Sequence, residues 1–292
     1  MATLEFVAAA SHAPGVTGWP DKVAPATRQE MDAAYHELGR RIRASRLDLL
    51  IVICNDHGSN FPLDDHPDLA FVLSETHVGP AEWFTNWLNV HTQYSLTGAP
   101  EAGRLLFDAL RADDVDLREL AGEVLFDDNL TIPTKMMGLA ELGVPVLPLM
   151  HNTMIPPVPR ERFCYDWGRR LRTAVETVLP AGMRVGILAT GGMSHEPGGA
   201  RYMLIDEEFD RRFLALVAAG DPERLLTEAT YEAMEAAGAG GTAELQSWLI
   251  AAGAAGGGPA ETLFYSPILE FRCGIGLVDW NVATTSPLEV AR

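Results

Sequence analysis

Four apolar runs along the chain each lead into a polar segment that carries a histidine. Runs of this length and composition are typical of buried strands. Because parallel strands end at the same edge of a sheet, we expect the four imidazoles to meet in one crevice there. The runs and their histidines are Leu4–Ala10 with His12, Leu49–Cys54 with His57, Val144–Met150 with His151, and the run starting at Val185 with His195.

The remaining segments alternate between helical and strand-like patterns, and no linker divides them. We therefore predict a single α/β domain over residues 1–292, with a central, mostly parallel or mixed sheet and helices on both faces. Trp83, Phe84 and Trp87 would form the buried stripe of one helix, in preference to the alternative of an aromatic wall for a substrate. The predicted helices are Ala26–Ser45, Glu82–Val90, Glu101–Ala112, Thr134–Leu142, Glu161–Val178, Met203–Ala218, Leu225–Ala237 and Thr242–Ala252. Further predicted strands are Leu69–Leu73, Val115–Leu120, Thr262–Leu269 and Cys273–Val278, and Leu125–Pro133 is predicted to be a loop.

Charge and cysteine content narrow the range of partners. With 40 acidic and 22 basic side chains the net charge is −18, which argues against nucleic acid or an anionic membrane surface as a partner. The three cysteines, Cys54, Cys164 and Cys273, are far apart and lack C-x-x-C spacing, so no disulfide framework is predicted. Since neither a signal peptide nor a membrane-spanning run is recognisable, we expect a cytoplasmic protein.

The motifs exclude several kinds of chemistry. The chain has no phosphate-binding or dinucleotide-binding glycine motif, and Glu196 stands where a nucleophile elbow at Ser194 would need glycine. What remains is a crevice of histidines and carboxylates. Two histidines and one carboxylate are the ligand set of non-haem Fe(II) oxygenases, but a zinc-dependent hydrolase could use the same histidines. Spacing alone does not decide which of them bind.

Several short stretches resemble the class III extradiol ring-cleaving dioxygenases, in particular the catalytic β subunits of protocatechuate 4,5-dioxygenases. They occur in the family's order over most of the chain. The matching stretches are Ser11-His12-Ala13-Pro14, Asn55-Asp56-His57, Gly191-Gly192-Met193-Ser194-His195, Glu208-Phe209-Asp210, Gly241-Thr242-Ala243-Glu244-Leu245 and Trp248-Leu249-Ile250.

The resemblance implies a ligand set and a reaction. His12, His57 and Glu244 would hold Fe(II), which we favour over Mn(II), and His195 would be the acid/base. Glu244 would lie in the first turn of a helix, with Thr242 as a candidate N-cap. The reaction would be O₂-dependent extradiol cleavage of a small catechol-like aromatic, of the dihydroxybenzoate, aminophenol or dihydroxypyridine type. Family members commonly form oligomers, and some pair with a small α subunit.

One position departs from the family pattern. Asp128 stands where family members commonly have a histidine near the substrate. Our hypothesis is that it faces a donor on the substrate, such as a ring N–H, an amine or an additional hydroxyl. Ser194 and His151 are further candidates for substrate contact, although Ser194 would equally brace its turn and His151 would equally be a buried structural residue. A rival interpretation of the whole chain is a non-catalytic partner subunit of a dioxygenase.

Overall fold

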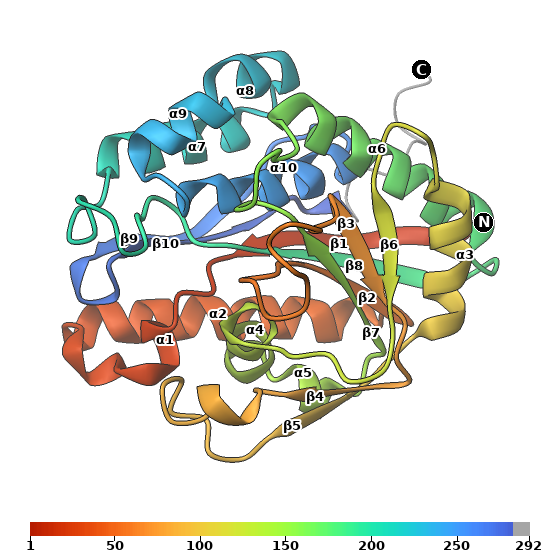
Figure 1. Cartoon of the computed structure of the whole chain (residues 1–292), viewed down its shortest axis with the longest axis horizontal. Helices are drawn as coiled ribbons and strands as arrows, with labels where there is room; N and C mark the ends of the chain where they lie inside the picture. Colours follow the sequence, from red (N-terminus) through yellow and green to blue (C-terminus); the bar gives the residue numbers. More distant parts are fainter. Residues whose placement is uncertain (283–292) are drawn as a thin grey trace.

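A computed structural model of the chain describes residues 1–282. Within them an eight-stranded mixed sheet runs in the order β6-β3-β7-β2-β8-β1-β10-β9, and β4 pairs with β5 in a separate hairpin (Figure 1). The strands of the large sheet are β1 (Thr3–Ala10), β2 (Leu49–Asn55), β3 (Leu69–Val72), β6 (Leu117–Leu120), β7 (Val146–His151), β8 (Arg184–Thr190), β9 (Glu261–Ile268) and β10 (Cys273–Asp279). The hairpin strands are β4 (Thr76–Gly79) and β5 (Tyr94–Thr97).

The four strands that precede the histidines are parallel neighbours at the centre of the sheet. β8 lies between β1 and β2, and β7 pairs with the other side of β2. The prediction of an α/β domain with these strands side by side is confirmed. Their carboxyl ends share one edge of the sheet, and the polar segments that follow them emerge there.

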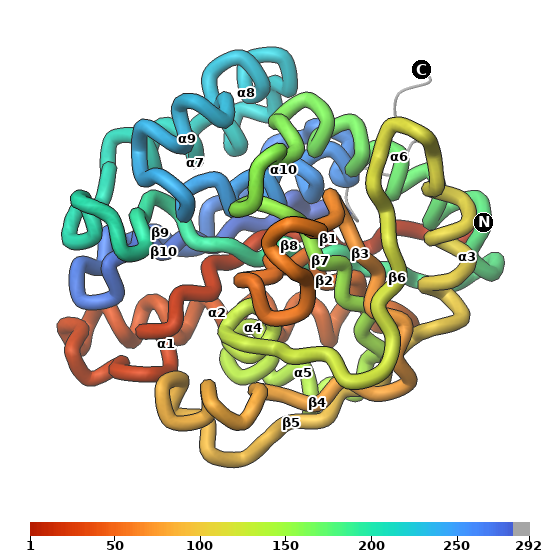
Figure 2. Tube along the Cα trace, viewed as in Figure 1, coloured from red at the N-terminus to blue at the C-terminus, as the bar shows by residue number. Residues whose placement is uncertain are grey.

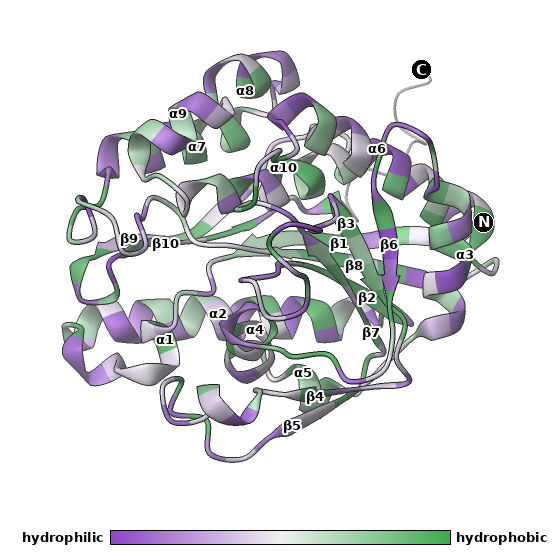
Figure 3. Ribbon diagram, viewed as in Figure 1, coloured by the Kyte–Doolittle hydropathy of each residue, from purple (hydrophilic) through white to green (hydrophobic). Residues whose placement is uncertain are grey.

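Helices cover both faces of the sheet. One face is packed by α3 (Pro100–Leu110), α6 (Glu161–Val178), α7 (Glu207–Ala219), α8 (Pro222–Glu228), α9 (Tyr231–Ala237) and α10 (Leu245–Ala254). The other is packed by α1 (Gly15–Gly18), α2 (Pro25–Ser45), α4 (Asp128–Met137) and α5 (Leu139–Leu142). Burial on both faces explains why the central strands are apolar along their whole length, and Figure 3 shows them hydrophobic while the outer sides of the helices are hydrophilic.

Several predicted segments differ from the structure. The helix predicted over Leu225–Ala237 is divided into α8 and α9, and the helix predicted to start at Met203 begins at Glu207. Within Glu82–Val90 only Glu82–Phe84 is helical, as a short 3₁₀ turn, and the segment belongs to the excursion that carries the β4–β5 hairpin. Leu125–Pro133 is not a loop, because α4 begins at Asp128. The side chain of Asp127 accepts a hydrogen bond from the N–H of Asn129 and so caps this helix, and Pro133 is tolerated within it. Among the described helices, none has the length and apolar character needed to cross a membrane.

Candidate metal centre

His12 lies two residues beyond the end of β1, and its turn is held by neighbours on both sides. The hydroxyl of Tyr35, on α2, donates to the carbonyl of Ser11 at 2.6 Å. On the other side the N–H of Ser11 donates to the carbonyl of Gly276 at 3.0 Å. Nδ1 of His12 is 3.0 Å from Oγ1 of Thr190 at the end of β8. These contacts fix the imidazole so that its Nε2 faces Glu244.

His57 lies two residues beyond β2 and is oriented by the start of α4. Its Nδ1 is 3.0 Å from Oδ2 of Asp127 and 3.4 Å from Oδ1 of Asp128. Its Nε2 points the opposite way, 3.3 Å from Oε1 of Glu244. A histidine whose outer nitrogen donates to a carboxylate is the usual arrangement around a protein-bound metal.

Glu244 closes a 3₁₀ turn, Thr242–Glu244, immediately before α10, and is 4% exposed. The backbone N–H of Gly192 donates to its Oε2. Thr242 does not cap the helix through its side chain. Its hydroxyl accepts a hydrogen bond from the backbone N–H of His195 at 3.2 Å, which ties the Glu244 turn to the His195 turn.

Gly191 allows this close approach. Its φ of +141° lies in a region that other residues rarely adopt. A Cβ added there would lie 2.9 Å from both Cβ and the carbonyl oxygen of Glu244. The two glycines after β8 therefore bring the backbone directly against the carboxylate.

The donor atoms of His12, His57 and Glu244 converge. One donor atom from each residue lies within 4.8 Å of the others, and Nε2 of His12 is 3.3 Å from Oε2 of Glu244. The two imidazole rings are nearly perpendicular, at 88°. Burial alone would raise the pKa of Glu244, but the nearby His12 and His195 hold that pKa well below its ordinary range. The Glu244 carboxylate therefore stays ionised. His12 and His57 each have Nδ1 in contact with another side chain and Nε2 turned toward this carboxylate. This arrangement fits a divalent transition metal with open coordination positions.

His195 lies beside His12, His57 and Glu244. Its Nδ1 is 2.8 Å from the carbonyl of Met193, so this nitrogen carries the proton when the ring is neutral. Its Nε2 is 3.6 Å from Oε1 of Glu244. Burial lowers the pKa of His195, but the neighbouring Cys273 and Glu244 raise it well above its ordinary range. The imidazole is therefore placed to hold and exchange a proton at the cleft.

A cleft of about 370 Å³ opens onto the three converging side chains. His12, His57, His195 and Glu244 line it, as does Asp128. Its volume suits a single substituted aromatic ring. Aromatic side chains form much of the remaining wall: Trp19, Phe84, Trp87, Tyr202 and Phe271.

The prediction that Trp83, Phe84 and Trp87 form a buried helical stripe is therefore wrong. Trp83 is 63% and Trp87 is 47% exposed, and Phe84 and Trp87 face the cleft. Trp19 joins this wall, with ring centroids 6.4 Å from Trp87 and 6.5 Å from Phe271. Helical spacing of aromatics did not distinguish a core stripe from the lining of a cleft.

Asp128 is nearly buried at the wall of the cleft and is the first residue of α4. Burial, and secondly the charge of Asp127, raise its pKa to about 7. Asp128 therefore contributes a titratable carboxyl group to the wall of the cleft.

The structure does not bring Ser194 or His151 to the cleft wall. Ser194 is fully buried, and its hydroxyl donates to Oδ2 of Asp210, on α7, at 2.9 Å. His151 is also fully buried, with Nδ1 3.0 Å from Oγ of Ser247 on α10. Burial lowers the pKa of His151 to about 3, so this imidazole is neutral. Ser194 braces its turn and His151 packs inside the protein, as the alternative interpretations had it.

The donor set of His12, His57 and Glu244 fits a metal centre of the two-histidine, one-carboxylate kind. The family model described as "Catalytic LigB subunit of aromatic ring-opening dioxygenase" matches residues 7–274, and the chain belongs to this family. The resemblance noted from the sequence is confirmed.

Two enzymes illustrate the similarity to curated relatives. A gallate dioxygenase of Pseudomonas putida KT2440 is 39% identical over 158 residues, which is 53% of this chain and 45% of that protein. A 2,3-dihydroxyphenylpropionate/2,3-dihydroxicinnamic acid 1,2-dioxygenase of Dechloromonas aromatica RCB is 26% identical over 87% of this chain and 92% of its own length. In fold, the chain is similar to the crystal structure of the uncharacterized protein JW3007 from Escherichia coli K12. The TM-score is 0.56 at 13% identity, with 85% of this chain and 91% of that one covered.

Four residues that shape the site were not singled out from the sequence. Asp127 and Thr190 each engage the outer nitrogen of one histidine, and Asp210 holds the turn before His195. Arg272 lines the cleft. Asp210 lies in a stretch already quoted for the family, and Asp127 directly precedes Asp128, so proximity in sequence to the candidate site residues was an available signal. Arg272 had no such signal.

Proposed function

We propose that this chain is a non-haem Fe(II)-dependent extradiol dioxygenase that cleaves a small catechol-like aromatic ring with O₂. The observation that carries the proposal is the convergence of Nε2 of His12, Nε2 of His57 and the Glu244 carboxylate at the inner end of the cleft. The family and the names of the relatives support the class of reaction.

In this proposal the protein's own side chains divide three tasks. His12, His57 and Glu244 hold Fe(II), which would supply the redox chemistry for O₂ and acidify a bound hydroxyl. His195 transfers protons to and from the second catechol hydroxyl through its Nε2. The aromatic wall excludes water and stacks against the ring.

Asp128 selects the substrate in this proposal. A carboxylate on the cleft wall would accept a hydrogen bond from a ring N–H, an amine or a third hydroxyl. We expect Asp128→His to improve turnover of protocatechuate relative to the other rings. Unchanged ring preference in Asp128→Ala would contradict this role.

The test is O₂ uptake by protein loaded anaerobically with Fe(II), across dihydroxybenzoates, aminophenols and dihydroxypyridines, with absorbance spectra of the products. We expect uptake matched by a ring-opened chromophore and abolished in His12→Ala. His36→Ala is the control, since His36 is an exposed histidine on α2. Loading with Mn(II) and Zn(II) in parallel separates iron from manganese, and turnover with Zn(II) in the absence of O₂ would indicate a hydrolase instead.

We further propose that the enzyme works as an oligomer in the cytoplasm. Met203 and Leu204, on the loop that follows His195, are 53% and 56% exposed, and their apolar surface favours a covered position in an assembly. The three cysteines are free and buried, as suits a reducing compartment. Sedimentation analysis of the purified chain would distinguish a homo-oligomer from a monomer that needs a separate small subunit.

A further inference from the structure

Arg272 is the one guanidinium or ammonium group among the described residues that line the cleft. It lies in the turn between β9 and β10, directly before Cys273. Four carboxylates share the lining with it, those of Asp127, Asp128, Glu196 and Glu244. A single cation in an otherwise acidic cleft, within a chain of net charge −18, calls for a physical reason.

None of those carboxylates neutralises Arg272. Within residues 1–282 its guanidinium forms no ion pair and no hydrogen bond, and its Nε is buried without a partner. Glu196 instead accepts a hydrogen bond from the backbone N–H of Arg201 at 3.0 Å. Asp127 and Glu244 face the histidines. A buried donor left without an acceptor is costly, and residues 1–282 supply none for Arg272, so this position can take an acceptor from a bound molecule.

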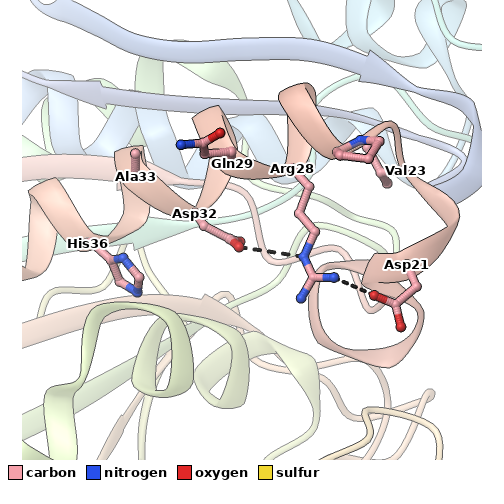
Figure 4. Close-up of a pocket in the computed structure, with 8 residues that line it drawn as sticks. Asp21, Val23, Arg28, Gln29, Asp32, Ala33 and His36 are labelled. Atoms are coloured by element: carbon pink, nitrogen blue, oxygen red, sulfur yellow. Dashed lines mark hydrogen bonds and ion pairs between the residues drawn. The ribbon is translucent and has the colours of Figure 1, made fainter.

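Arg28 shows how other arginines of this chain are satisfied. It lies in an open surface groove along α2, where it pairs with Asp21 and, at 3.6 Å, with Asp32 (Figure 4). Both partners lie beside it on the same surface, so the charge of Arg28 is balanced within the protein. Arg272 has a comparable side chain but no such partners.

The position of the Arg272 guanidinium is fixed by stacking. Its Cζ lies 4.6 Å from the centroid of the Tyr202 ring, which also lines the cleft. Stacking on an aromatic face holds the planar fork while leaving its N–H groups free. The backbone at Arg272 has φ +58°, a left-handed conformation that glycine or asparagine would adopt more readily. The arginine at this position is therefore explained by its side chain rather than by the turn.

We infer that Arg272 binds a carboxylate carried by the aromatic substrate. A guanidinium fork matches the two oxygens of a carboxylate, and partial burial against aromatic rings strengthens the pair relative to water. The substrate class is then a catechol-like ring with an acidic substituent, oriented with its hydroxyls toward His12, His57 and Glu244 and its carboxylate toward the β9–β10 turn. This inference rests on the proposed function for the reacting end of the ring, whereas the anion site itself does not require the oxygenase chemistry.

The first test compares two substrates, one with a carboxylate and one with a neutral amide at the same ring position. Turnover by the Fe(II)-loaded enzyme is measured with 3,4-dihydroxybenzoate and with its neutral amide, 3,4-dihydroxybenzamide. In Arg272→Gln we expect kcat/KM for the acid to fall about 10- to 100-fold, mainly through KM, and that for the amide to change less than about twofold. Arg272→Lys should retain part of the preference for the acid, and Arg28→Gln is the matched control. Equal losses for acid and amide, or no loss for either, would overturn the inference.

A binding measurement separates this inference from the dioxygenase proposal. Calorimetric titration of the metal-free protein with 4-hydroxybenzoate and 4-hydroxybenzamide needs no turnover. We expect the acid to bind more tightly than the amide to the unaltered chain and equally to Arg272→Gln. If no ring is cleaved but this difference is found, the anion site stands and the reaction is wrong. If both ligands bind alike to the unaltered chain, the anion site is wrong whatever the turnover.

Discussion

Asp127 lies 3.0 Å from Nδ1 of His57 and, through its other oxygen, accepts a hydrogen bond from the N–H of Asn129. One carboxylate therefore both caps α4 and orients a proposed metal ligand. Because the helix start and the ligand share a residue, the position of α4 and the geometry of the centre are coupled.

We expect Asp127→Asn to weaken metal binding by about 10- to 100-fold. The amide oxygen can still accept the hydrogen bond from His57, but the negative charge that raises the basicity of the ring is lost. Anaerobic competition with a chelator measures the affinity. The control is Asp114→Asn, an exposed aspartate paired with Arg170 on the surface. Unchanged affinity in Asp127→Asn would contradict the orienting role.

Gly191→Ala should damage the centre without touching a proposed ligand. The new methyl group would lie 2.9 Å from Cβ of Glu244, so the carboxylate must move. We expect at least a tenfold loss of metal affinity and a loss of about 1–3 kcal/mol in the free energy of unfolding.

Gly182→Ala is the control that distinguishes a steric clash with Glu244 from backbone strain. Gly182 has φ +84° and no atom within 4 Å of an added Cβ, so this variant carries the strain alone. It should lose stability but keep its metal affinity. Equal metal affinities in the two variants would show that the approach of Gly191 to Glu244 does not matter.

Trp87→Ala should weaken substrate binding and leave stability nearly unchanged. Trp87 lines the cleft and is already 47% exposed, so its removal costs contact with the ring rather than core packing. We expect KM to rise about 3- to 15-fold. Trp83→Ala is the matched control, since Trp83 is 63% exposed and outside the cleft. A large fall in melting temperature for Trp87→Ala would instead support the buried helical stripe.

Asp210 predicts a pH dependence of stability. Burial raises its pKa to about 6 in the folded chain, above its ordinary value of 3.8. Below about pH 4 the carboxyl is protonated in both states, and between about 4 and 6 the folded state binds more protons than the unfolded state. Its contribution to the free energy of unfolding therefore falls as pH rises through this window, by roughly 3 kcal/mol in total.

Urea unfolding at pH 4.5 to 7 measures this contribution as a difference in slope. Asp210→Asn removes the titration, so its free energy of unfolding should fall less with rising pH than that of the unaltered chain. Glu207→Gln, an exposed carboxylate on the same helix, should retain the original slope. Parallel curves for Asp210→Asn and the unaltered chain would contradict the assignment.

The sequence was informative about the central strands because they are apolar throughout, and it placed their polar ends on one edge. His12, His57 and His195 all lie beyond the last residue of a strand and reach the cleft. His151 does not, because it is the last residue of β7 itself. Alternate residues of a strand face the same side, so its side chain points to the helix layer that Leu147 and Leu149 pack against. The sequence pattern therefore predicted that His151 lies at the edge of the sheet, but not toward which face its side chain points.

Other parts of the site depend on contacts between distant segments, which no local pattern encodes. Leu125–Pro133 is predicted to be a loop, whereas the cap supplied by Asp127 allows α4 to begin at Asp128. Phe84 and Trp87 reach the cleft only because their excursion folds back over the end of the sheet. Arg272 is a common residue type in an ordinary turn, and its significance comes from neighbours such as Tyr202 that lie about 70 positions away in the chain.

β1 and β10 lie side by side although they come from opposite ends of the described chain, as the red and blue tubes of Figure 2 show. The turn that carries His12 is tied to this late strand, since Ser11 is hydrogen bonded to Gly276. During synthesis on the ribosome, the turn that carries His12 can therefore be fixed only after β10 has been made, when almost the entire polypeptide is present. Loading of a metal at the proposed site would then follow translation rather than accompany it.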